Sequence, residues 1–163
     1  MRFVIALARE NVQRQTGGPF GAAVFDAEGR LVASGVNIVE TSNCSILHAE
    51  MVAIALAQKK LNRYDISDEG KSDHELVTSS EPCAMCFGAI IWSGVTGLVC
   101  GGRDQDARSI GFDEGPKLPD WLQALEERGV QVSRDVLRQE AVEVLNLYLK
   151  TGGTIYNARR SAK

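Results

Sequence analysis

Glu81-Pro82-Cys83-Ala84-Met85-Cys86 is the stretch that decides how this chain folds. Its proline is typical of the first turn of a helix, and an apolar run over 84–92 continues the helical pattern. In a helix that begins here, Cys83 and Cys86 leave the same face, and the helix N-terminus favours them as thiolates. The stretch therefore predicts a helix whose first turn presents two soft metal ligands.

A second motif, His48-Ala49-Glu50, opens a segment over 48–61 that is rich in helix formers. His48 and Glu50 are two positions apart and do not share a face inside a regular helix. Both are therefore expected at the first turn, where a site can lie over the helix end. Together the two motifs form the pattern H-x-E…P-C-x-x-C, which zinc-dependent base deaminases share.

The chemistry of a catalytic zinc explains these residue types. With His48, Cys83 and Cys86 as ligands, one Zn²⁺ per chain keeps its fourth tetrahedral position for water, which the metal acidifies. Glu50 is then expected to carry protons from the water to a ring nitrogen and to the departing ammonia.

Other readings of the cysteines stay open at this point. Cys44 lies four residues before His48, so a closed structural Cys₃His site is one alternative, and a redox pair is another. Neither alternative accounts for Glu50. Cys100 lies in an apolar strand and is expected in the core, whereas His74 has no partner at ligand spacing and is expected on the surface.

Strands and helices alternate along the chain, which predicts an α/β sheet covered by helices. The expected strands are 21–26, 31–37, 75–78, 95–100 and 130–133. Further helices are expected at the N-terminus up to Gly17, over 119–128, and over 135–150 with Asp135 as its cap.

Composition narrows the class of protein. The 163 residues suit one domain over 1–163, and no stretch is long and apolar enough to cross a membrane. A net charge of −3 and a pI near 5.4 offer no surplus for a phosphate backbone, so a nucleic-acid partner is not expected. Four cysteines without an export signal fit a reducing cytoplasm.

The chain resembles the cytidine deaminase-like superfamily and, within it, the bacterial guanine deaminase family. The stretches that carry the resemblance are Gly18-Pro19-Phe20-Gly21-Ala22, Gly35-Val36-Asn37, His48-Ala49-Glu50, residues 81–90, and Gly111-Phe112-Asp113-Glu114-Gly115. It implies a three-layer α/β/α sandwich around a five-stranded mixed sheet. The chain departs from the family at Cys44-Ser45-Ile46-Leu47, where Asp-Pro-Thr is common.

The same resemblance implies residue roles that spacing does not show. Glu114 would be a second catalytic carboxylate at the substrate amino group, unless it is an exposed loop residue. Asn37 would read the edge of the base, while Phe20 and Trp92 would be pocket walls, with a place in the core as the alternative. The substrate-binding residues implied in full are Phe20, Asn37, Ala49, Trp92, Phe112, Asp113 and Tyr156.

The C-terminal segment 152–163 is predicted to be a lid. Gly152-Gly153 supplies a flexible joint, and Tyr156 supplies an aromatic tip that would close the pocket. A frayed terminus is the alternative. The resemblance also implies a homodimer, in which Tyr156 would serve the partner's site if C-terminal elements are exchanged.

The expected reaction is hydrolysis of guanine to xanthine and ammonia. A tRNA adenosine deaminase is the nearest alternative, supported by the basic residues Arg159, Arg160 and Lys163 and opposed by the acidic pI. A deaminase of cytosine or an aminotriazine would keep the chemistry and change the base. A zinc-stabilised binding module is the non-enzymatic alternative.

Overall fold

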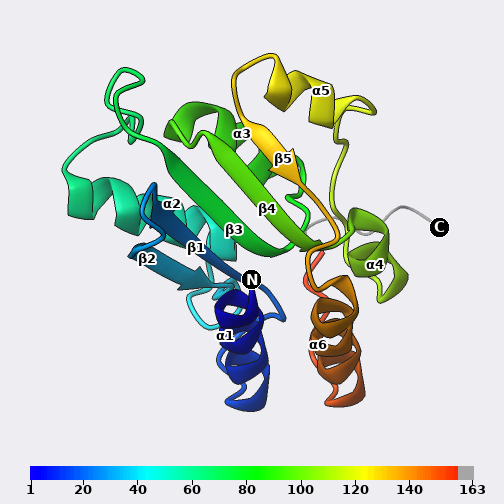
Figure 1. The fold of residues 1–163 in the computed structure, drawn as a ribbon. Coiled ribbons are helices and arrows are strands. Elements are labelled where there is room, and N and C mark those ends of the chain that lie inside the picture. Colours follow the sequence, from blue (N-terminus) through cyan, green and yellow to red (C-terminus); the bar gives the residue numbers. More distant parts are fainter. Residues whose placement is uncertain (158–163) are drawn as a thin grey trace.

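A computed structural model describes residues 1–157, which form a mixed sheet between two layers of helices (Figure 1). The strands run in the order β2-β1-β3-β4-β5 and are β1 (Gly21–Asp26), β2 (Leu31–Val36), β3 (His74–Ser80), β4 (Gly97–Gly102) and β5 (Gln131–Ser133). The helices are α1 (Arg2–Gln13), α2 (Ala49–Leu61), α3 (Ala84–Ser93), α4 (Asp104–Ser109), α5 (Trp121–Glu126) and α6 (Arg138–Lys150).

The strand directions bring the carboxyl ends of several strands together at one edge of the sheet. β1 is antiparallel to β2 and β3, and β3, β4 and β5 are parallel to one another. The carboxyl ends of β2, β3 and β4 therefore share an edge with the amino end of β1. In α/β sheets such an edge is where ligands bind.

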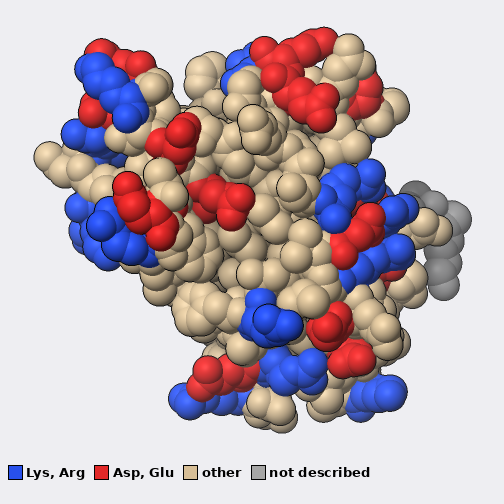
Figure 2. All heavy atoms as spheres, viewed as in Figure 1, with Lys and Arg blue, Asp and Glu red and all other residues tan. Residues whose placement is uncertain are grey.

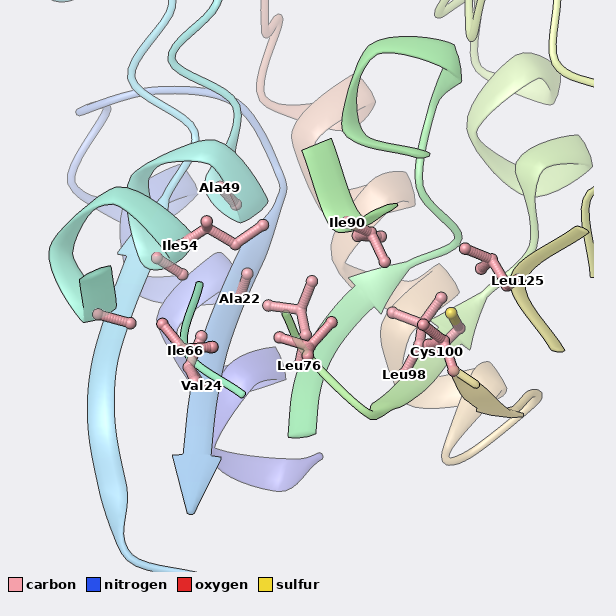
Figure 3. Close-up of a cluster of buried hydrophobic side chains, with 14 of the residues drawn as sticks. Ala22, Val24, Ala49, Ile54, Ile66, Leu76, Ile90, Leu98, Cys100 and Leu125 are labelled. Atoms are coloured by element: carbon pink, nitrogen blue, oxygen red, sulfur yellow. The ribbon is translucent and has the colours of Figure 1, made fainter. Parts of the chain in front are cut away.

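One face of the sheet packs against α2, α3 and α5. Strand residues that alternate along β1, β3 and β4, such as Ala22, Leu76 and Leu98, point into this layer. Figure 3 shows them beside Ile54 of α2 and Ile90 of α3. Cys100 is fully buried in this core, as the sequence predicts.

The opposite face packs against α1 and α6, so the sheet is covered on both sides. The intervening strand residues Ala23 and Val77 form a cluster with Val4 of α1. α6 packs beside α1 and contributes Val144 and Leu145 to a second cluster. The predicted three-layer α/β/α sandwich with a five-stranded mixed sheet is thus confirmed.

The start of α2 lies close against β2, and a glycine makes this possible. A Cβ atom on Gly35 would lie 2.6 Å from the Ala49 carbonyl oxygen and 2.7 Å from the Ala53 amide nitrogen. Real Cβ atoms essentially never make contacts this short, so a side chain at this position would push the helix outward. The glycine thus fixes the distance between the sheet edge and His48.

Several sequence-based expectations are wrong in detail. The helix expected from Asp135 begins at Arg138, because Asp135 and Leu137 both adopt the left-handed backbone conformation. The Asp135 carboxylate accepts two hydrogen bonds from Arg103 at 2.8 Å instead of capping the helix. α4 was not expected, and His74 is buried at the start of β3 rather than exposed. Within the described residues, no helix is long and apolar enough to cross a membrane.

Candidate active site

Two helix starts converge at the sheet edge, and each places a metal-ligand type at its N-cap. His48 caps α2 and Cys83 caps α3, both with extended backbone. Neither side chain makes a capping hydrogen bond, so each is available to the site. Glu50 lies in the first turn of α2, which confirms the constraint derived from the spacing of His48 and Glu50.

The three predicted metal ligands lie within hydrogen-bond range of one another. The Nδ1 atom of His48 is 3.5 Å from the sulfur of Cys83 and 3.7 Å from the sulfur of Cys86. Zinc–nitrogen bonds of about 2.0 Å and zinc–sulfur bonds of about 2.3 Å in a tetrahedron require a nitrogen–sulfur separation of about 3.5 Å. The donor set and its spacing therefore fit one zinc ion with an open fourth position.

Cys44 does not join this group. Among residues 1–157, the cluster that could hold a metal contains only His48, Cys83 and Cys86. The closed Cys₃His site is therefore wrong, and a catalytic zinc site with three protein ligands remains.

The electrostatics of the polypeptide alone suit a cation. A hydrogen bond from Cys86, aided by one with His48, lowers the pKa of Cys83 to about 4. Because Cys86 donates this hydrogen bond, the bond and burial both raise the pKa of Cys86. Burial lowers the pKa of His48, but its hydrogen bond with Cys83 and nearby negative charges outweigh this and raise it. A divalent ion would displace these protons, as metal binding to thiols and imidazole requires.

Two carboxyl groups are buried beside the ligands. Glu50 is 8% exposed and Glu114 is 7% exposed, and within the described chain neither forms an ion pair with lysine or arginine. Burial and then the Cys83 thiolate raise the pKa of Glu50 to about 6. Burial, followed by the charges of Cys83 and Glu50, raises the pKa of Glu114 to about 8. Both groups are therefore disposed to exchange protons near neutral pH.

These groups surround a small cavity of about 50 Å³. The residues that line it are Phe20, His48, Glu50, Glu81, Cys83, Phe112, Asp113, Glu114, Tyr156 and Asn157. They come from the loop before β1, the starts of α2 and α3, the loop after α4, and the C-terminal segment. The cavity thus joins parts of the chain that are far apart in sequence.

Aromatic rings form one side of the cavity. The Phe112 ring contacts those of Phe20 and Tyr156 edge-on, each with centroids 5.1 Å apart, and stacks with Tyr148 at 6.0 Å. The Tyr156 hydroxyl and the Asn37 side-chain NH₂ are buried without a partner among the described residues. A Cβ atom on Gly18 would lie 3.1 Å from the Asn37 Oδ1 and would overlap the Tyr156 hydroxyl, so both polar groups lie around this glycine. Buried groups of this kind are available to a ligand.

Three residues predicted for substrate binding, Asn37, Ala49 and Trp92, are not among those that line the cavity. The Trp92 side chain is 79% exposed and does not line the cavity, so its role as a wall of this chain's own pocket is wrong. Position 92 is six residues after Cys86 and therefore faces away from the buried side of α3. Ala49 is fully buried against β2 and does not line the cavity.

Sequence reasoning missed two lining residues. Glu81 precedes the cysteine motif, and its buried carboxylate accepts hydrogen bonds from Arg134 Nε at 2.6 Å and from the Asp104 amide at 3.0 Å. Asn157 accepts a hydrogen bond from the Asp113 amide and donates one to the Gly111 carbonyl oxygen, both at 3.0 Å. Its position beside Tyr156 was the one available signal.

Fold and site together define a class, the mononuclear zinc hydrolases with three protein ligands and an adjacent carboxylate. Residues 1–102 match the family described as the cytidine and deoxycytidylate deaminase zinc-binding region. The chain belongs to this family, as the sequence motifs indicate.

Three relatives are most informative. The protein NE0047, solved in complex with 2,6-diaminopurine, is 50% identical, with a TM-score of 0.89, over 97% of this chain and 84% of that one. A solved guanine deaminase from Nitrosomonas europaea is 48% identical, with a TM-score of 0.86, over 91% of this chain and 81% of that one. The guanine deaminase of Bacillus subtilis is 37% identical over 130 residues, which are 80% of each chain.

Proposed function

We propose that this chain is a guanine deaminase, which hydrolyses guanine to xanthine and ammonia. The observation that carries the proposal is the pair of buried carboxyl groups, Glu50 and Glu114, in one cavity with the His48, Cys83 and Cys86 cluster. The similarity to two guanine deaminases supports the choice of base.

His48, Cys83 and Cys86 would hold the zinc ion, which when bound lowers the pKa of a water molecule in its fourth position. Glu50 takes a proton from the attacking water and delivers it to N3 of guanine. The new bond joins the water oxygen to C2, and the bond from C2 to the exocyclic nitrogen breaks. Glu50 is placed for this because it lies in the same first helical turn as the His48 cap.

Glu114 faces the same cavity from the loop after α4. We assign it to the exocyclic amino group, which it binds and to which it relays the second proton of the attacking water as ammonia leaves. The water oxygen then remains on C2 as the carbonyl of xanthine. A carboxyl group with a raised pKa can donate this proton near neutral pH, whereas an exposed carboxylate would have lost it.

Recognition of the base is assigned to groups around the aromatic side of the cavity. Asn37 and Tyr156 supply the unpartnered polar atoms, and Phe20 and Phe112 supply ring surfaces on which a purine can lie. A site that hydrogen-bonds one edge of a base rejects bases that lack this edge, by up to about 10⁴-fold. These contacts therefore favour guanine over adenine and cytosine.

A free base is favoured over a base in RNA. On the face shown in Figure 2, basic side chains are interspersed with acidic ones rather than gathered in a continuous field. Around α4 and α6, Arg103, Arg108 and Arg138 each pair with an aspartate. Arg159, Arg160 and Lys163, which supported the tRNA alternative, lie outside the described residues.

Release of ammonia from a panel of substrates tests the proposal. Purified protein loaded with zinc is incubated with guanine, adenine, cytosine, an aminotriazine and a tRNA anticodon stem-loop. We expect turnover of guanine at least about 10²-fold above the others in kcat/KM. Comparable kcat/KM for the stem-loop would assign the chain to the tRNA deaminases instead.

The C-terminal segment is proposed as the lid of this cavity. A volume of about 50 Å³ leaves room for one or two waters, at about 30 Å³ each, and not for a purine. The segment that carries Tyr156 has a glycine joint, since Gly152 adopts a positive φ of 76° and Gly153 packs against the Tyr148 ring. The loop that carries Glu114 also has glycines with positive φ, Gly111 and Gly115, but hydrogen bonds from Ala84 and Arg108 hold its backbone. Movement about the joint at Gly152 would admit the base.

We further propose a homodimer in which α3 lies at the interface. Met85, Gly88 and Trp92 follow one another at helical spacing on the outer side of α3, whereas Ala89 packs against the core. A Cβ atom on Gly88 would meet nothing within 4 Å, so the helix offers a flat place for close approach. Sedimentation analysis should give a dimer, and Trp92→Glu should give a monomer.

A further inference from the structure

The loop over 112–118 carries Glu114 across the start of α3. The Ala84 amide donates a hydrogen bond to the Glu114 carbonyl oxygen at 2.9 Å, so the loop backbone lies against the turn that presents Cys83. On either side of Glu114, Asn157 accepts a hydrogen bond from the Asp113 amide at 3.0 Å and Arg108 donates one to the Gly115 carbonyl oxygen at 2.9 Å. The structure provides a further, buried attachment three residues after Glu114.

That attachment is Lys117, whose side chain is 8% exposed. Its ammonium nitrogen donates a hydrogen bond to the Pro82 carbonyl oxygen at 3.0 Å and lies 3.3 Å from the nearer carboxylate oxygen of Asp104. Glu81 Oε2 is 4.0 Å away, and the centroid of the Trp121 ring is 4.4 Å away. A buried ammonium is tolerated because it has such partners, and they hold it in one position.

The partners of Lys117 belong to the segments that build the metal site. Pro82 directly precedes Cys83, and Asp104 begins α4, the helix from which the loop departs. Glu81 is itself fixed by Arg134. The lysine therefore joins the loop to a rigid frame on the metal side of the cavity.

We propose that Lys117 is a positioning residue for Glu114, and this rests on the guanine deaminase function proposed above. Lys117 does not line the cavity, so it acts through the loop rather than on the substrate. By tying the loop to the Pro82 carbonyl oxygen, it sets the distance between the Glu114 carboxyl group and the metal ligands. A misplacement of about 1 Å in such a group can cost about 10²-fold in rate.

Lys117→Met tests the proposal, because methionine fills a similar volume and lacks the ammonium group. We expect zinc to be retained, kcat for guanine to fall about 10- to 100-fold with a smaller change in KM, and amide hydrogen exchange over 112–118 to accelerate. Lys60→Met is the matched control, since Lys60 also donates to a backbone carbonyl, that of Val32 at 2.9 Å, away from the site. It should leave kcat and the exchange of this loop unchanged.

A double-mutant cycle with Glu114→Gln separates positioning from general stability. If Lys117 acts through Glu114, adding Lys117→Met to Glu114→Gln should lower kcat by less than about two-fold. The proposal would be overturned if the loss of kcat in the double variant equalled the product of the losses in the two single variants. It would also be overturned if Lys117→Met left both kcat and the hydrogen exchange of the loop unchanged. If Lys117→Met does not fold, Asp104→Asn replaces it as the test, because it removes the charge of one partner of the ammonium. We expect a smaller fall in kcat and a smaller acceleration of loop exchange in this variant. An unchanged kcat and loop exchange in Asp104→Asn would also overturn the proposal.

Failure of the proposed function gives a different result. A wild-type protein that binds zinc and does not deaminate guanine would refute the function, and the hydrogen-exchange comparison would still report whether Lys117 anchors the loop. A Glu114→Gln variant with normal kcat would remove Glu114 from the reaction and, with it, the role of Lys117.

Discussion

Two pairs of carboxyl groups differ in their surroundings: Asp104 and Asp106 at the start of α4, and Glu50 and Glu114 in the cavity. Asp104 and Asp106, at the start of α4, each pair with arginine, and Asp104 also pairs with Lys117. Glu50 and Glu114 are buried, and within residues 1–157 neither has such a partner.

The consequence is a difference in proton affinity. Hydrogen bonds from Arg138 lower the pKa of Asp106, whereas burial raises the pKa of Glu50 to about 6 and that of Glu114 to about 8. A carboxylate with a guanidinium partner stays ionised near neutral pH and has a structural role. A buried carboxyl group without a cation partner can exchange protons in this range. Glu81, which is 4% exposed and pairs with Arg134, shows that burial alone does not identify a catalytic carboxyl group; the missing partner does.

Loss of the metal should have the largest effect. Cys83→Ala and Cys86→Ala remove one of three ligands, and we expect zinc content near zero and kcat at background, measured by elemental analysis and ammonia release. Cys44→Ala is the control and should keep both, because Cys44 lies outside the cluster. Loss of zinc in that control would restore the closed structural site.

Glu50→Gln should have the next largest effect. The amide keeps the shape of the side chain but does not carry protons, so kcat should fall by about 10²- to 10⁴-fold while zinc content and guanine binding are retained. Steady-state kinetics and calorimetric titration measure the two quantities. A kcat within a few-fold of wild type would show that Glu50 does not transfer protons in the reaction. The contrast between unpaired and paired carboxyl groups would then have no catalytic meaning.

Truncation after Thr151 should have a moderate effect. It removes Tyr156 and Asn157 from the cavity wall, and kcat/KM for guanine should fall on the order of 10- to 100-fold, or about 1.4–2.7 kcal/mol, with zinc still bound. Truncation after Asn157 is the control because it keeps these two residues. If the shorter protein has wild-type kinetics, the segment is a terminus and no lid.

Asp106→Asn should have the smallest effect, and on stability rather than catalysis. Asp106 accepts a hydrogen bond from the Arg103 amide at 2.7 Å and two from Arg138 at 2.8 Å. Its loss should lower the free energy of unfolding by about 1–2 kcal/mol at pH 7.

The difference in unfolding free energy between wild type and Asp106→Asn should depend on pH, and its direction follows from the lowered pKa of Asp106. The pKa of Asp106 is lower in the folded state than the 3.8 of an unperturbed group, so the stabilisation is complete above that value. It should disappear as the pH falls through the folded-state pKa. Urea unfolding of both proteins at pH 7 and near pH 3 measures this, and a difference that grows at low pH would contradict the assignment.

The metal site could be predicted from the sequence because its signals are local. Two cysteines three residues apart after a proline, and a histidine before a helix, already place the ligands at helix starts. Glu114 could be implicated only by family resemblance, because Asp113-Glu114-Gly115 has the composition of an exposed loop. Its burial depends on the packing of its loop against the start of α3, where the Ala84 amide donates to the Glu114 carbonyl oxygen, and no local pattern encodes this contact.

Other features depended on tertiary contacts in the same way. The helix expected from Asp135 begins three residues later because Arg103, at the end of β4, binds the Asp135 carboxylate. Trp92 follows an apolar run, which predicts burial, and its exposure became visible only once the side of α3 that packs on the sheet was known.

The origin of the cavity wall has a consequence for the order of synthesis. The lining begins at Phe20, before the first strand, and ends at Tyr156 and Asn157, after the last helix. On a ribosome, the metal ligands and the sheet strands emerge well before the residues that close the pocket. Among the described residues, Tyr156 and Asn157, which complete the cavity wall, are therefore synthesised after all three metal ligands and all five strands.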